Sequence, residues 1–193
     1  ILFDSVSSSG ANSITLSNLG QAAGSSGIDI NGGSIVNATS RGVDINSIQA
    51  DVSIATSIST TATGRSVEVT NSGSTAAGGN AIIFSGAIDD NGLGINLDNN
   101  DQNTNGTTIT FTGGLDIDSL ANAGFTATNG GTVNVTGTNT IDTTTGIALN
   151  VANTTIGASD LTFQSISVNG AVNGIVLNTT GTHGGLTVTG TST

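Results

Sequence analysis

The chain of 193 residues contains no cysteine, proline, methionine, tryptophan or tyrosine, and its only strongly basic side chains are Arg41 and Arg65. Without cysteine the protein forms neither disulfides nor thiolate nucleophiles, and it lacks the ligands of most structural zinc sites. Thirteen acids against the two arginines give a formal net charge of −11. Nucleic acids and anionic membrane surfaces both attract cations, so neither is expected as a partner. No apolar run approaches the roughly 20 residues of a membrane span, so membrane insertion is not expected either.

Glycine, asparagine, serine and threonine dominate instead, and only 8% of the residues are charged. Disorder is the first alternative for so polar a chain. Disordered chains are usually poor in β-branched residues and have a higher charge density, whereas this one is rich in isoleucine, valine and threonine. The composition therefore favours a folded β-protein.

A short phrase recurs along the chain: a small residue, then two apolar residues separated by one other residue, then a polar residue. Its clearest copies are Gly146-Ile147-Ala148-Leu149-Asn150 and Gly174-Ile175-Val176-Leu177-Asn178. Alternation of this kind predicts a strand with one buried face. Further copies of this first strand begin at Gly27, Gly42, Ser66, Gly94 and Gly124, and Ser13-Ile14-Thr15-Leu16 fits as a degenerate earlier copy.

A second alternating strand follows the first, as in Ile82/Phe84, and a third is clearest at Leu115/Ile117 and Ile166/Val168. Three short strands per irregular repeat, with like residues in like positions, predict an all-β parallel β-helix (β-solenoid) of about seven to eight coils. Apolar side chains then stack in columns inside. The second-strand column is expected to contain Ile54, Phe84, Phe111, Val135, Phe163 and Val188. A bacterial Ig-like β-sandwich is the alternative fold, but its core normally contains tryptophan or tyrosine.

The whole chain, 1–193, is expected to be one solenoid segment, with a degenerate first coil over 1–26 and clear repeats over 27–193. Ile1-Leu2-Phe3-Asp4 has no signal-peptide layout, and Thr193 comes just past a second strand. Neither end carries a capping sequence. We therefore expect a segment of a longer repeat protein, or a subunit that stacks end to end into a fibre.

The GIxLN and GLTVTG phrases at 146–150, 174–178 and 185–190 resemble the right-handed parallel β-helix repeats of large bacterial surface and secreted proteins, such as adhesins and autotransporter passengers. The resemblance covers about 27–193. It implies an extracellular or cell-surface location and a non-enzymatic role as a structural rod in adhesion, display or fibre assembly. The implied partners are the protein itself, by end-to-end or lateral assembly, or a surface glycan or protein ligand.

The resemblance also implies a stacked asparagine ladder in one turn of the coil. Asn31, Asn46, Asn150 and Asn178 occupy the matching position of the phrase, while Thr70, Asp98 and Thr128 interrupt it. The connections that follow differ in length: 129–131 is short, and 71–80, 98–107, 151–160 and 179–185 are long. In a solenoid such insertions project from one face, so this face is the leading candidate for contacts with a partner.

Asp29, Asp44 and Glu68 occupy the outward position between the two apolar residues of consecutive first strands. Carboxylates stacked about 4.8 Å apart repel each other, so something must offset them. Either Arg41 and Arg65, which precede two of these strands, supply the offsetting charge, or the column captures Ca²⁺ between coils.

A second calcium candidate is the polar loop that starts at Asp98, with Asn100 and Asp101 as further oxygen ligands. No acid stands twelve residues after Asp98, where an EF-hand has its bidentate glutamate, so a plain polar loop is the alternative. No cofactor is required, and Ca²⁺ is the one these residues suggest.

Catalysis is the principal alternative function, because polysaccharide-binding and polysaccharide-cleaving enzymes also use β-helices. Asp89, Asp90, Asp116 and Asp118 fall in one region of adjacent coils, and His183 is a conceivable helper. Sugar clefts normally have aromatic platforms and lyases need several basic residues, so no catalytic residue is assigned. Outward threonines, as in Thr187-Val188-Thr189, keep ice binding as a minor alternative, against ordinary β-propensity.

Overall fold

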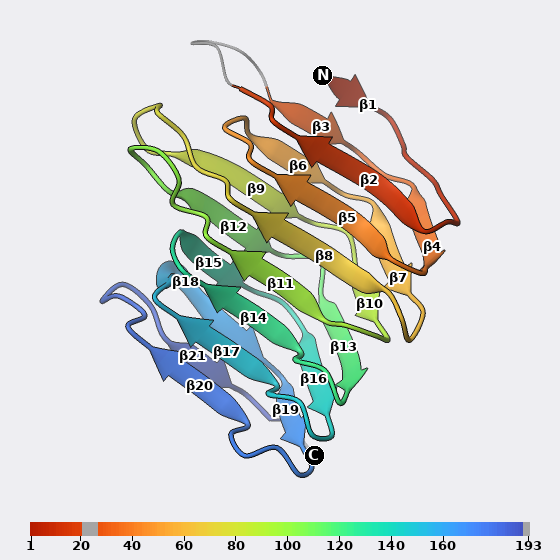
Figure 1. Ribbon diagram of the computed structural model, residues 1–193, viewed down its shortest axis with the longest axis vertical. Helices are drawn as coiled ribbons and strands as arrows, with labels where there is room; N and C mark the ends of the chain where they lie inside the picture. Colours follow the sequence, from red (N-terminus) through yellow and green to blue (C-terminus); the bar gives the residue numbers. More distant parts are fainter. Residues whose placement is uncertain (21–26, 191–193) are drawn as a thin grey trace.

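The computed structural model describes residues 1–20 and 27–190, in which all regular structure is β-strand (Figure 1). The chain crosses three sheets in a repeating order, and from β3 to β20 each coil contributes one strand to each sheet. We name them sheets A, B and C in the order of crossing; they have eight, six and seven strands. All pairings between these strands are parallel, so the expected parallel β-solenoid with three strands per coil is confirmed. The described residues contain no helix that is long and apolar enough to cross a membrane.

The strands are short, and most are three to six residues long. Sheet A consists of β1 (Leu2–Phe3), β3 (Ile28–Ile30), β6 (Val52–Ile54), β9 (Asn80–Phe84), β12 (Thr107–Phe111), β15 (Thr132–Val135), β18 (Thr155–Phe163) and β21 (Leu186–Val188). Sheet B consists of β4 (Ser34–Ala38), β7 (Ser57–Thr60), β10 (Ile88–Asp90), β13 (Leu115–Leu120), β16 (Asn139–Thr143) and β19 (Ser165–Val168). Sheet C consists of β2 (Asn12–Ser17), β5 (Arg41–Asn46), β8 (Arg65–Thr70), β11 (Ile95–Asp98), β14 (Phe125–Thr128), β17 (Leu149–Ala152) and β20 (Ile175–Asn178).

The expected first coil is described only in part. Within residues 1–20, β1 pairs with β3 and β2 pairs with β5, so the chain already follows the solenoid path there. The rest of that expectation, at 21–26, and the expected end at Thr193 lie outside the described residues.

The predicted second-strand column is confirmed over most of sheet A. Ile54, Phe84, Phe111 and Val135 are successive partners on β6, β9, β12 and β15. The prediction is wrong at the next coil, because Val135 pairs with Leu161 rather than with Phe163. The cause is a bulge in β18: Val133 pairs with Ile156 and Val135 with Leu161, so residues 157–160 lie opposite one residue of β15.

Four phenylalanines nevertheless form one continuous aromatic column in the core. The rings of Phe84 and Phe111 are stacked, with centroids 4.9 Å apart and planes 10° apart. Phe125 reaches in from sheet C and meets Phe111 edge-on at 5.6 Å, and Phe163 meets Phe125 edge-on at 6.4 Å. Aromatic contacts of both kinds add to the stability that burial provides. The column therefore links the central coils through their largest side chains.

Two first strands were misplaced by the sequence pattern. The phrase that starts at Gly27 forms β3 in sheet A, whereas Ile14 on β2 is the sheet C neighbour of Val43. In the phrase that starts at Gly146, Leu149 rather than Ile147 lies beside Phe125, a shift of two residues. Both errors preserve the buried face of the strand.

The small residue that begins each first strand lies at the corner where sheet B passes into sheet C. A Cβ atom built on Gly124 would lie 2.7 Å from Cγ2 of Ile141 and 2.6 Å from the carbonyl oxygen of Ala148. Neither distance is sterically acceptable, so this coil admits only glycine at the corner, and such close packing is consistent with a small residue at the first position of the phrase. Within the described coils the same position holds Ser13, Gly42, Ser66, Gly94, Gly124, Ala148 and Gly174.

The predicted asparagine ladder is wrong, because the asparagines assigned to it do not occupy neighbouring positions in one sheet. Asn31 follows a sheet A strand, Asn150 pairs with Thr126, and Ala152 rather than Asn150 is the neighbour of Asn178. The actual column is the position directly after each sheet C strand, where every residue is left-handed with φ between 51° and 59°. Asparagine tolerates this conformation better than most residues. The column consists of Asn18, Ser47, Asn71, Asn99, Asn129, Asn153 and Thr179.

Asn99 allows a test of this corner. Its Nδ2 donates to Oδ1 of Asn71 at 2.7 Å, and its Oδ1 accepts from Nε2 of Gln102 at 2.7 Å. We expect Asn99→Ala to lower the free energy of unfolding by about 1–2 kcal/mol, because alanine is strained at positive φ and forms neither bond. Asn99→Gly should lower it less, since glycine is unstrained there. Urea denaturation followed by circular dichroism measures both, and an equal loss for the two variants would rule out the strain.

Candidate functional site

The connections from sheet C to sheet A project from one edge of the solenoid, as the insertion pattern predicted (Figure 1). The loops at 71–79 and 99–106 bond to each other: Ser74 and Asn105 exchange two backbone hydrogen bonds of 2.7 and 2.9 Å. Nδ2 of Asn103 donates to the carbonyl of Gly73 at 3.0 Å. The predicted insertion at 151–160 is instead largely absorbed into β17 and the bulged β18. These loops therefore use many of their polar groups on each other.

The acids of the first predicted calcium column are divided between two sheets. Asp44 and Glu68 are neighbours on β5 and β8, but Asp29 lies on sheet A beside Ser53. Nε of Arg41 is bonded to Glu68 and lies 3.8 Å from Asp44, and the Glu68 hydrogen bond raises the pKa of the arginine. Arg41 therefore offsets the charge of both carboxylates on sheet C. The predicted three-acid column does not form.

Two of the three residues of the second calcium candidate, Asp98 and Asn100, have a side-chain oxygen engaged within the fold. Oδ1 of Asp98 accepts from Oγ1 of Thr128 at 2.6 Å and from Nδ2 of Asn129 at 2.8 Å. Asn100 is buried; its Oδ1 accepts the backbone N–H of Ser72 at 3.2 Å, and its Nδ2 donates to the carbonyl of Val69 at 2.9 Å. Asp101, by contrast, is exposed. Asn100 is therefore a structural residue that ties one coil to the previous one.

Calcium binding stays a prediction. Among residues 1–20 and 27–190, no group of three or more histidine, cysteine, aspartate or glutamate side chains is arranged to hold a metal ion. If Ca²⁺ nevertheless binds at these acids, EDTA will lower the melting temperature and added Ca²⁺ will restore it. Equal melting temperatures in EDTA and in Ca²⁺ would remove both candidates.

The four acids of the catalytic alternative lie on opposite sides of sheet B. Asp89, Asp116 and Asp118 are exposed on its outer face, whereas Asp90 is fully buried. Oδ2 of Asp90 accepts the N–H of Ser66 at 2.7 Å, and its Oδ1 accepts two further backbone N–H groups at 2.9 and 2.8 Å. Asp90 therefore closes the corner from sheet B to sheet C, and it is not available to a substrate.

The outer face of sheet B carries an acidic cluster that includes one residue the sequence analysis did not single out, Asp142. Asp116 is the strand neighbour of Asp89, and Asp118 is the neighbour of Asp142. Partial burial and the charges of Asp116, Asp142 and Asp89 together raise the pKa of Asp118. Register decides this grouping, so only strand alignment could have revealed it from the sequence.

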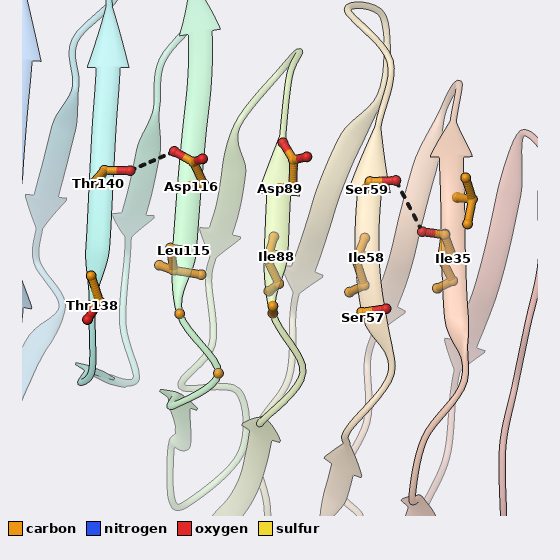
Figure 2. Close-up of a pocket in the computed structure, with 14 residues that line it drawn as sticks. Ile35, Ser57, Ile58, Ser59, Ile88, Asp89, Leu115, Asp116, Thr138 and Thr140 are labelled. Atoms are coloured by element: carbon orange, nitrogen blue, oxygen red, sulfur yellow. Dashed lines mark hydrogen bonds between the residues drawn. The ribbon is translucent and has the colours of Figure 1, made fainter.

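A groove runs along the same face, where sheet A passes into sheet B. It has a volume of about 450 Å³ and extends from Val36 on β4 to Thr140 on β16. Figure 2 shows Ser59, Asp89, Asp116 and Thr140 in one row across neighbouring strands, beside a row of Ile58, Ile88 and Leu115. Small residues open the groove on the corner side, where Ala87, Gly113 and Gly114 line it.

Charge removal tests the acidic cluster. Because the pKa of Asp118 is raised in the folded protein, its ionised form destabilises the fold above that pKa, and the penalty vanishes below the unfolded value of about 3.9. We expect Asp118→Asn to raise the melting temperature at pH 7 and to leave it unchanged at about pH 3. Asp101→Asn, an exposed loop acid with the same charge change, serves as the control. A gain of equal size at both pH values would contradict the prediction.

His183, the proposed catalytic helper, is exposed in the connection between β20 and β21, at the sheet C to sheet A edge. The acids of sheet B lie on another face, so the structure does not bring these groups together. The sequence pattern missed the groove because its walls come from five coils and from residues without a common motif. No protein-family model, curated protein or solved structure matches this chain.

Proposed function

We propose that this chain is a stretch of a rigid, non-enzymatic rod in an extracellular or cell-surface protein. Its role would be in adhesion, display or end-to-end fibre assembly. In this respect it would act like the β-helix repeats of adhesins and autotransporter passengers that its phrases resemble. Three continuous parallel sheets support the proposal, because every coil is hydrogen-bonded to the next along the whole described length.

The observation that carries the proposal is an apolar interior left open at both described ends. On the last coil, Ile175 and Leu177 are each 43% exposed and Val188 is 47% exposed, although their neighbours one coil earlier are fully buried. At the other end, Phe3 is 45% exposed, although its neighbour Ile30 one coil later is buried. A further coil, from the same polypeptide or from a second copy, would cover these side chains and satisfy the free strand edges.

The absence of lysine supports assembly through the ends. Natural sheet edges are commonly blocked by charged side chains, lysine above all. This chain has no lysine, and β20 and β21 carry no charged residue. The ends therefore favour strand pairing, and the sides of the rod remain available for display.

The 193-residue chain tests the proposal directly. We expect light scattering and electron microscopy to show a concentration-dependent series of rods whose lengths are multiples of the protomer. Leu177→Lys, at the end, should abolish the series, whereas Ile83→Lys, on the side of sheet A at 39% exposure, should leave it intact. A strictly monomeric chain at high concentration, or assembly blocked by Ile83→Lys alone, would contradict end-to-end joining.

A further inference from the structure

The groove on sheet B combines three features that point to one kind of occupant. It is long, Val36 and Ala87 expose apolar side chains along it, and two carboxylates line it. It spans β4, β7, β10, β13 and β16, and four strand spacings of about 4.8 Å make roughly 19 Å. An extended peptide advances about 3.3 Å per residue, so this length matches roughly six residues. A small ion or a compact metabolite would fill only part of it.

The charge of the groove is not balanced within the described protein. Asp89 and Asp116 line it, and Asp118 and Asp142 extend the negative face along β13 and β16. In residues 1–20 and 27–190 the ion pairs all belong to Arg41, which is bonded to the acids of sheet C. Arg65 is half-buried, and its Nη1 points to the carbonyl of Gly94 at 3.5 Å. A partner must therefore bring its own cation to offset these carboxylates.

The carboxylates of Asp89 and Asp116 can each accept a hydrogen bond from a partner's donor. Oγ1 of Thr140 donates to Oδ1 of Asp116 at 2.6 Å, and Nδ2 of Asn91 donates to Oδ1 of Asp89 at 2.6 Å. These bonds orient the two carboxylates on adjacent strands, so each presents its other oxygen. A guanidinium group has a planar set of donors that suits carboxylates better than a single ammonium does.

We infer that this groove binds an extended segment of a partner protein that carries an arginine, with the guanidinium on Asp89 and Asp116 and small apolar side chains along the corner wall. Ser57 and Thr138, both exposed at the groove, can bond the backbone of the segment. The groove lies on the side of the rod, so this binding is independent of assembly through the ends.

The probe is the six-residue peptide Ala-Ala-Val-Arg-Val-Ala-amide with fluorescein on its N-terminal amine, measured by fluorescence anisotropy in about 0.15 M NaCl, where charges beyond about 8 Å are largely screened. We expect saturable binding, and roughly tenfold or greater weakening when glutamine replaces the arginine of the peptide. Asp89→Asn combined with Asp116→Asn should weaken binding by a similar factor. Ala87→Ile, which narrows the groove without changing charge, should weaken it as well.

The matched control is Asp29→Asn combined with Asp101→Asn, which removes two exposed charges away from the groove. It should leave the affinity unchanged, and amide shifts in ¹⁵N spectra should concentrate at Ala87, Gly113 and Gly114. No binding of the arginine peptide, or equal weakening by the two double variants, would overturn the inference. So would binding that is indifferent to Ala87→Ile. Circular dichroism melts of each variant ensure that a loss of binding is not a loss of fold.

Discussion

Replacing Phe111 by alanine is expected to lower the free energy of unfolding by about 3–5 kcal/mol. Phe111 is fully buried, and it is the one ring that contacts both a stacked neighbour, Phe84, and an edge-on neighbour, Phe125. Truncation loses the burial of the ring and both aromatic contacts, and it leaves a cavity between β12 and β14. The surrounding strands are hydrogen-bonded to coils on either side, so the cavity cannot collapse easily.

The matched control for Phe111 is Ile83→Ala on the adjacent strand β9. Ile83 points outward and is 39% exposed, so its truncation should change stability by less than about 1 kcal/mol. Because each coil contacts mainly its neighbours, a solenoid can open part by part, and hydrogen exchange should accompany denaturation. We expect Phe111→Ala to raise exchange most in β9, β12 and β14. Uniformly faster exchange along the rod would argue that the aromatic column is not a local link.

Replacing Asp90 by alanine is expected to destabilise the protein by about 3–5 kcal/mol, because three buried backbone N–H groups lose their side-chain acceptor. Water can enter the corner and recover part of this energy. Asp90→Asn should be intermediate: one amide oxygen can still accept two of the bonds, but the NH₂ group then faces a third N–H donor. The order of stability should therefore be aspartate, then asparagine, then alanine.

Asp89→Asn is the control for Asp90, with the same change of charge at the preceding residue. Asp89 is exposed on the outer face, so its replacement should alter stability by no more than about 0.5 kcal/mol. Hydrogen exchange at the amides of Ser66, Gly92 and Gly94 directly reports whether the corner from sheet B to sheet C stays closed, since these amides donate to Asp90. If their protection survives in Asp90→Ala, the carboxylate is not what closes the corner.

The sheet B corner shows why sequence reasoning assigned Asp89 and Asp90 to the same constellation. The two residues are adjacent in the chain, but neighbouring residues of a strand point to opposite faces. One carboxylate therefore faces solvent and the other faces the interior. The position of β10 in the chain decides which of the two carboxylates is buried. The weak pattern of the third strand did not locate β10.

The groove and the acidic cluster could not have been found by motif. Asp116 and Asp142 come from different coils separated by loops of unequal length, and their grouping depends on the pairing of β13 with β16. Asp29 illustrates the converse error. Its local phrase is identical in pattern to that of Asp44, yet β3 belongs to sheet A and β5 to sheet C.

The repeating pattern of residues was enough to predict a parallel solenoid with three strands per coil, and it also predicted most of the sheet A column from Ile54 to Val135. Alternating side chains and recurring residue types carry that information, because a strand that slips by one residue exposes its apolar face. A slip of two residues exposes nothing, so the pattern could not distinguish Ile147 from Leu149 as the neighbour of Phe125. Nor could it say which of three sheets receives a given strand. The tertiary structure decided those choices through loop lengths, the β18 bulge and the left-handed corners, and with them it decided which acids share a face.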